Sequence, residues 1–119
     1  MLFVEDDRSV AEMYKLKLEL EGYRVDIASD GEMAIKMADH EPPDIIFLDV
    51  RLPKLDGFGV LQALRANPKT KDVRVVVMSN YSQRELGDRV ANLGVLDYLM
   101  KTETTPAKLA ADLKRWLGS

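Results

Sequence analysis

DIIFLDV, residues 44–50, is the stretch of this sequence that decides the fold. It is nearly all apolar and rich in strand-forming residues, without the polar alternation of a strand that has one face in water. Such a run is typical of a central strand in a parallel sheet, covered by helices on both faces. Asp49 ends the run, where an unpaired charge costs free energy. We therefore expect a buried central strand with a functional acid at its carboxyl end.

Strand-like and helix-like segments alternate on both sides of this stretch. The segments expected to form strands are 2–4, 23–29, 44–50, 73–79 and 95–100. The segments expected to form helices are 8–22, 32–40, 58–66, 82–93 and a last one that opens at Thr105-Pro106. This strict alternation predicts an α/β fold, a doubly wound five-stranded parallel sheet with five helices on its two faces and right-handed crossovers.

The composition is that of one globular domain spanning residues 1–119. The chain is 46% hydrophobic and 31% charged, has no apolar run that could span a membrane, and is acidic by position 5 where a secretory signal would be apolar. Its net charge of −3, with both signs interspersed, argues against direct nucleic-acid binding. The absence of cysteine excludes disulfides and thiolate sites and suits the cytoplasm. We expect a cytoplasmic domain without membrane attachment.

Reactive side chains stand at the carboxyl ends of four expected strands. The acids of residues 5–7 (EDD) follow the first strand, Asp49 lies at the end of the third, Ser79 ends the fourth and Lys101 follows the fifth. In a doubly wound sheet these strand ends meet at one edge, and ligands bind there. The sequence therefore predicts a site that combines carboxylates, a hydroxyl and an ammonium group.

These residue types together indicate phosphoryl chemistry. Asp6, Asp7 and Asp49 held close together would repel one another, and a hard divalent cation such as Mg²⁺ removes that conflict. A carboxylate nucleophile, a cation, Lys101 and the Ser79 hydroxyl are the parts needed to transfer a phosphoryl group to an aspartate. Each residue alone also has an ordinary explanation. The acids can cap a helix or a turn, the hydroxyl can end a strand, and the lysine can be a solvated surface charge.

The whole chain closely resembles the receiver domain of bacterial two-component response regulators. The motifs that carry the resemblance are VEDD at 4–7, IIFLDVRLPKLDG at 45–57, VVVMS at 75–79 and DYLMK at 97–101. The intervals of 30 residues from Asp49 to Ser79 and 52 residues from Asp49 to Lys101 also fit the family. The resemblance implies a flavodoxin-like strand order of 2-1-3-4-5 and a function in phosphorelay signal transduction.

The resemblance also implies a role for each site residue. Asp49 matches the phosphoacceptor, and Lys101 matches the lysine that contacts the phosphoryl group. Asp6 and Asp7 match the acidic pair that binds Mg²⁺ or Mn²⁺, together with Asp49 and the backbone carbonyl of Arg51.

Two further residues match the switch of the family. Ser79 corresponds to the switch hydroxyl, and Tyr98 to the aromatic residue that turns inward when the hydroxyl moves. The ordinary alternative for Tyr98 is an amphipathic residue at the edge of the sheet, with its polar tip in water.

Three residues beside the phosphoryl position set this chain apart. Thr102 follows Lys101 where the family usually has a proline in a cis bond, so we expect the Lys101 loop to be trans or differently set. Asn80 follows Ser79 where a small residue is usual, and its bulk predicts a comparatively long-lived phosphorylated state. Arg51 is either a shield for the phosphoryl group or a solvated side chain.

Two functions of different classes are compatible with these residues. The first is a phosphorylation-activated switch, which accepts a phosphoryl group from a sensor histidine kinase or phosphotransfer protein. It would assist its own phosphorylation and dephosphorylation without being a conventional enzyme. Its surface of helix 82–93, strand 95–100 and the last helix would then contact a downstream protein, an output domain or a second copy of itself as a homodimer.

The alternative is a pseudo-receiver that docks or dimerises without phosphorylation. A flavin-binding domain of similar topology is disfavoured, because acids follow the first strand where a phosphate-binding loop needs Gly, Ser or Thr. The sequence is compatible both with a stand-alone regulator and with one domain of a larger protein.

Overall fold

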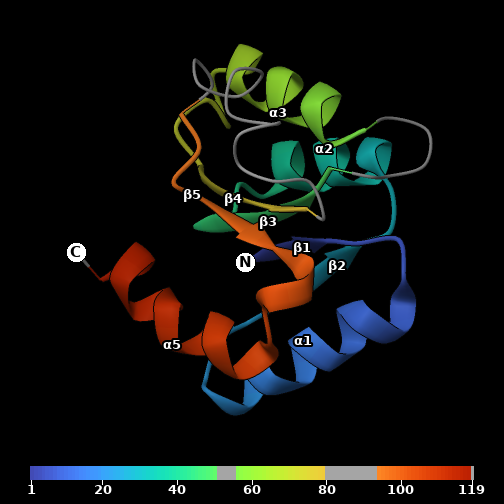
Figure 1. Cartoon of the computed structure of the whole chain (residues 1–119). Coiled ribbons are helices and arrows are strands. Elements are labelled where there is room, and N and C mark those ends of the chain that lie inside the picture. Colours follow the sequence, from blue (N-terminus) through green and yellow to red (C-terminus); the bar gives the residue numbers. More distant parts are fainter. Residues whose placement is uncertain (51–55, 80–93, 119) are drawn as a thin grey trace.

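The computed structural model describes residues 1–50, 56–79 and 94–118, and a parallel sheet lies at its centre (Figure 1). The strands are β1 (Leu2–Val4), β2 (Asp26–Ala28), β3 (Ile45–Asp49), β4 (Arg74–Ser79) and β5 (Asp97–Met100). They lie in the order β2-β1-β3-β4-β5, and every pairing is parallel. The predicted α/β fold and strand order are confirmed.

Helices cover both faces of the sheet. The helices of the described residues are α1 (Arg8–Leu20), α2 (Gly31–His40), α3 (Gly57–Ala66), the short 3-10 helix η1 (Lys101–Glu103) and α5 (Pro106–Leu117). Helices α1 and α5 pack side by side on one face, and α2 and α3 pack together on the other (Figure 1). The predicted helix at 82–93 lies outside the described residues. Among the helices that are described, none has the length and apolar character needed to cross a membrane.

Each face of the sheet has its own apolar core. Beneath α1 and α5 the core is aromatic, with contacts from ring to ring between Phe3 and Tyr14, between Phe3 and Phe47, and between Phe47 and Trp116. Beneath α2 and α3 it is mostly aliphatic. Strand β3 lies between the two cores, and all five of its residues are buried. The uninterrupted apolar run of this strand therefore reflects burial on both faces.

Side-chain caps fix the point at which each helix begins. Asp7, Asp30, Asp56 and Thr105 accept hydrogen bonds from backbone N–H groups in the first turns of α1, α2, α3 and α5. These N–H groups have no partner within the helix, so a short polar side chain before each helix stabilises its start. Helix α1 begins soon after β1 for this reason, which places its first turn at the carboxyl edge of the sheet.

Strand β2 is shorter than the predicted 23–29. It pairs with β1, which has only three residues, so a ladder of three residue pairs is available to it. The Asp26 N–H donates to the Met1 carbonyl at 2.9 Å, where the ladder begins. Val25 is buried just before this point without belonging to the strand. The length of β2 is therefore set by the short strand β1 with which it pairs, and not by the alternating pattern of residues 23–29.

Candidate functional site

The register of the sheet brings the ends of four strands to one edge. Glu5 follows β1 at the level of Asp49 on β3. Ser79 ends β4 one residue beyond that level. Lys101 comes directly after the β5 residue that pairs with Ser79. The predicted meeting of carboxylates, a hydroxyl and an ammonium group at this edge is therefore what the topology produces.

Lys101 bridges two buried carboxylates at this edge. Its Nζ donates hydrogen bonds to Asp49 Oδ2 and to Glu5 Oε2, each at 2.7 Å. Asp49 is 4% exposed and Glu5 is 3% exposed, and burying a carboxylate costs free energy unless it has polar partners. The peptide bond between Lys101 and Thr102 is trans. The threonine in place of the usual proline therefore leaves the lysine within reach of Asp49.

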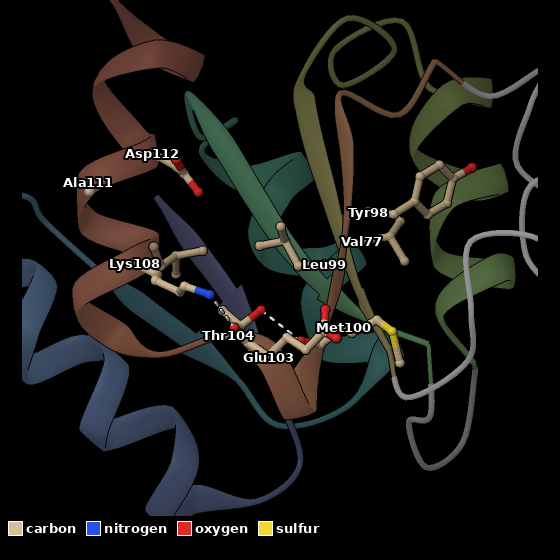
Figure 2. A pocket seen from close by; sticks show the side chains of 10 residues that line it. Val77, Tyr98, Leu99, Met100, Glu103, Thr104, Lys108, Ala111 and Asp112 are labelled. Carbon is tan, nitrogen blue, oxygen red and sulfur yellow. Dashed lines mark hydrogen bonds between the residues drawn. The ribbon is translucent and has the colours of Figure 1, made fainter.

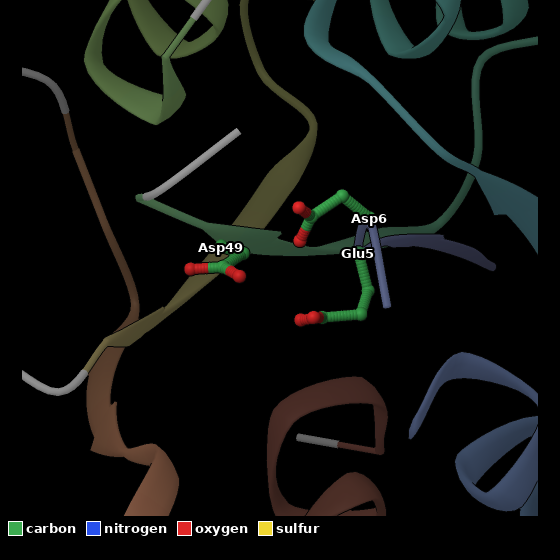
Figure 3. Close-up of side chains that lie close together, drawn as sticks. All are labelled: Glu5, Asp6 and Asp49. Atoms are coloured by element: carbon green, nitrogen blue, oxygen red, sulfur yellow. The ribbon is translucent and has the colours of Figure 1, made fainter. Parts of the chain in front are cut away.

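Glu5, Asp6 and Asp49 form the candidate metal site (Figure 3). One carboxylate oxygen from each of the three lies within 4.8 Å of the other two. Figure 3 shows the carboxylates of Glu5 and Asp6 directed toward Asp49. All the donors are anionic oxygens, which suits a hard cation such as Mg²⁺. The geometry and the donor type therefore fit the predicted ion.

The structure places the acidic pair one residue earlier than predicted. Asp7 lies outside the acidic group, because its Oδ1 accepts hydrogen bonds from the N–H groups of Ser9 at 3.0 Å and Val10 at 3.3 Å. Its carboxylate caps α1 instead of joining the other acids. Glu5 takes its place beside Asp6 and is the site residue that the sequence reasoning missed. The position of Glu5 directly after the apolar run of β1 indicates that it lies at the carboxyl end of that strand, beside the site.

The charges of this site are unbalanced in favour of acids. The pKa of Glu5 is raised from 4.5 to about 7, mainly by burial; the hydrogen bond to Lys101 opposes this rise, and the neighbouring Asp49 contributes to it. Burial lowers the pKa of Lys101, but its hydrogen bonds to Asp49 and Glu5 outweigh this and hold the pKa above 10.5. Among the described residues, the Lys101 ammonium group therefore faces three carboxylates. A divalent cation would add positive charge to this acidic group.

Helix α3 begins against the backbone of Asp49. A Cβ atom on Gly57 would lie 2.5 Å from the Asp49 carbonyl oxygen and 2.7 Å from the Cα of Val50, so only glycine fits. The Gly57 N–H donates to the Val50 carbonyl at 2.9 Å. Asp56 caps the helix by accepting from the Gly59 N–H at 2.9 Å. These contacts hold the end of β3, and with it Asp49, in place.

The predicted switch residues lie on β4 and β5. Ser79 is buried at the end of β4. Tyr98 is partly buried, packs on the core beneath α2 and α3, and has a pKa raised by burial. Figure 2 shows Tyr98 and Leu99 on opposite sides of β5. Arg51 and Asn80, the predicted modulating residues, lie outside the described residues, as does the Arg51 carbonyl expected as a metal ligand.

A groove runs between β5 and α5 (Figure 2). Its volume is about 480 Å³, and its walls combine Leu99 and Met100 with the polar residues Glu103, Lys108 and Asp112. Lys108 Nζ donates to the Glu103 carbonyl at 3.0 Å and so joins α5 to η1. Met100 and Glu103, which lie on either side of Lys101 in the sequence, both line the groove. The site and the groove therefore share one segment of backbone.

Comparisons with known proteins identify relatives along nearly the whole chain. A family model described as response regulator receiver domain matches residues 1–114. The probable transcriptional regulator ycf27 of Guillardia theta is 35% identical over 96% of this chain and 43% of its own length. The DNA-binding dual master transcriptional regulator RpaA of a Synechocystis strain is 35% identical over 97% of this chain and 49% of its own length. The chain thus spans less than half the length of these relatives.

Solved structures share the fold closely. The chemotaxis protein CheY4 of Vibrio cholerae superposes with a TM-score of 0.89 at 28% identity, covering 98% of this chain and 96% of that one. The receiver domain of the sensor histidine kinase PA1611 from Pseudomonas aeruginosa gives a TM-score of 0.87 at 31% identity, covering 99% and 96%. That structure has a magnesium ion coordinated in its active site cleft.

Proposed function

This chain belongs to the response regulator receiver domain family of two-component signalling, and on that basis we propose that Asp49 accepts a phosphoryl group in a Mg²⁺-dependent reaction. The observation that carries the proposal is the pair of 2.7 Å hydrogen bonds from Lys101 Nζ to Asp49 and Glu5. They hold a cation beside a buried carboxylate at a strand end, together with the acids that suit a metal ion. These are the parts that phosphoryl transfer to aspartate needs.

The side chains of the site have complementary tasks in the transfer. An Asp49 carboxylate oxygen attacks the phosphorus of a phosphohistidine. The new O–P bond forms as the P–N bond breaks, and the imidazole leaves with the electron pair and takes up a proton. Lys101 moves from the carboxylates to a phosphoryl oxygen and balances its charge. Ser79 donates a hydrogen bond to another phosphoryl oxygen. The rigid start of α3 at Gly57 keeps Asp49 oriented throughout.

Glu5, Asp6 and Asp49 are the described residues that would hold Mg²⁺. When bound there, the ion supplies charge neutralisation for the phosphoryl oxygens. The proximity of the three carboxylates supports this assignment. Glu5 would act mainly by adding negative charge beside Asp6, because one of its oxygens is already bonded to Lys101.

The response would pass to the surface of β5 and α5. Movement of Lys101 would shift η1, which starts at that residue and borders the groove between β5 and α5. Inward rotation of Tyr98 upon movement of Ser79 would change the opposite side of β5. We propose that the altered surface regulates a downstream protein or an output domain, and that a histidine kinase or phosphotransfer protein donates the phosphoryl group.

Beryllofluoride, which mimics an aspartyl phosphate, tests the proposal directly. With Mg²⁺ present, we expect amide NMR shifts at Lys101, Glu103 and Tyr98 in the wild-type chain and none in Asp49→Asn. Asp44 is an exposed acid just before β3, the strand that ends in Asp49. Asp44→Asn is therefore the matched control and should respond like the wild type. The alternative, a module that docks without phosphorylation, predicts no response in any of the three proteins.

A further inference from the structure

Helix α1 presents an apolar stripe to solvent. Met13, Leu16 and Leu20 are 51%, 64% and 75% exposed. Their spacing of three and four residues places them on one face of the helix. The opposite face, which includes Ala11 and Leu18, is buried against the sheet. The stripe is therefore no part of the domain core, and contiguous exposed apolar surface of this kind marks a contact with another molecule.

Charges of opposite sign flank the stripe. When Met13, Leu16 and Leu20 occupy positions a, d and a of a heptad, Glu12 and Glu19 occupy position g on one side. Lys17 occupies position e on the other side. Glu12 pairs with Arg8 within α1 at 3.1 Å, and Lys17 pairs with Glu21, directly after the helix, at 3.0 Å. All four side chains are at least 38% exposed. Exposed pairs contribute little to stability and can be exchanged for others at small cost.

We propose that α1 is the contact between two copies of this chain, which associate through parallel, in-register α1 helices. In such a pair each residue at g lies beside the e residue five positions on in the other helix. Glu12 of each copy then meets Lys17 of the other, twice by symmetry. An antiparallel pair would instead bring the two g rows together, with Glu12 against Glu19. The apolar stripe and the charges beside it on one helix therefore complement those of a second α1 when the two helices are parallel.

The rest of the fold permits this arrangement. Ala11 and Leu18 occupy position f, opposite the stripe, so the bodies of the two domains lie on the outside of the helix pair. A contact made by one helix is small beside the ~1,200–2,000 Å² of stable interfaces, so we expect a weak dimer with a dissociation constant of roughly micromolar to millimolar size. The contact does not involve Asp49 or the groove at β5, so it does not depend on phosphorylation.

Charge reversal tests the pairing, with sedimentation equilibrium at rising concentration as the measurement. Glu12→Lys and Lys17→Glu should each weaken association by about tenfold or more, because like charges then meet twice in the dimer. An equimolar mixture of the two variants should associate at least as strongly as the wild type, because an E12K helix beside a K17E helix restores opposite charges on both sides. Charge variants that associate like the wild type would overturn the proposal.

Cysteine crosslinking tests the parallel orientation, since the chain has no cysteine of its own. Ser9 is exposed and lies one turn before Met13 at position d. In a parallel pair, oxidised Ser9→Cys and Leu20→Cys should each form crosslinks with their own kind. In an antiparallel pair the two variants would crosslink with each other when mixed, and that result would overturn the proposed geometry.

An apolar-to-acid change tests the stripe itself. Leu16→Glu should abolish dimerisation while circular dichroism stays that of the wild type. Met33→Glu, at an exposed residue of α2, is the matched control and should leave association unchanged. A wild-type chain that stays monomeric at millimolar concentration would overturn the proposal. If Leu16→Glu then slows phosphoryl transfer from a kinase, the stripe is a docking surface for that kinase instead.

Discussion

Glu5 is a buried acid of this protein's site whose charge is compensated only in part. It is buried, it shares the one Lys101 ammonium group with Asp49, and its pKa rises from 4.5 to about 7. At neutral pH it is therefore close to the midpoint between its charged and neutral forms. Proton uptake by Glu5 frees Lys101 to pair with Asp49 alone, and proton loss strengthens the acidic group that suits a metal ion.

The raised pKa of Glu5 has a definite effect on stability. Because the pKa of about 7 in the folded protein exceeds the 4.5 of an exposed glutamate, folding favours the protonated form. The stabilisation is complete below pH 4.5 and is lost as the pH rises through about 7. Across this range the metal-free wild type should lose roughly 1–3 kcal/mol of unfolding free energy relative to Glu5→Gln.

Urea unfolding in EDTA at several pH values measures this difference. Glu32→Gln, at an exposed position of α2, is the control and should parallel the wild type. A gap between wild type and Glu5→Gln that stays constant with pH would show that the Glu5 carboxyl does not titrate in this range.

Asp49, Ser79 and Lys101 could be predicted from the sequence because each stands at or just after the end of an apolar run. Which of the three acids at residues 5–7 lie beside Asp49 could not be predicted from the sequence. Neighbouring side chains point in different directions where a strand ends, and nothing in the letters EDD marks where β1 stops and the cap of α1 begins. The burial of Glu5 depends on the register between β1 and β3, which is a tertiary property.

Helix α1 owes its start to Asp7, and this separates the roles of two adjacent acids. Asp7→Ala should lower the unfolding free energy by about 1 kcal/mol, because two N–H groups of the first turn lose their acceptor. Asp7→Asn keeps an acceptor and should cost much less. Neither change should greatly alter Mg²⁺ affinity in calorimetric titration, whereas Asp6→Asn should weaken it by tenfold or more. Equal losses of Mg²⁺ affinity in Asp7→Asn and Asp6→Asn would return Asp7 to the metal site.

The existence of the described helices and strands follows from local pattern, but their limits and faces do not. Leu16, Leu18 and Leu20 alternate as in a strand, yet all three lie in α1, where good helix formers and the length of the segment decide. Only Leu18 of the three is buried, and the other two are exposed. Which leucine faces the core is set by how α1 packs on the sheet and on α5, and that packing is not encoded within the helix.

The order of the strands belongs to the molecule as a whole. Alternation of strands and helices predicts a parallel sheet, and the resemblance to receiver domains supplied the order 2-1-3-4-5. Contacts at the far edge of the sheet, away from Asp49, could not be predicted. Arg65 at the end of α3 donates to the carbonyl of Gly94, 29 residues away, and to those of Lys71 and Val73. No local pattern connects these segments.

Arg65 holds the start of β5 to the rest of the domain, because its guanidinium joins α3, the segment before β4 and the turn at Gly94. Lysine cannot make this planar set of bonds, so Arg65→Lys should cost about 1–2 kcal/mol. The Leu96 amide, which donates to Val75 at 2.9 Å, should then exchange its hydrogen roughly tenfold faster. Arg74→Lys, at an exposed residue of β4, should change neither quantity. Unchanged exchange at Leu96 would show that the strand pairing alone fixes β5, and that Lys101 reaches Asp49 without help from this contact.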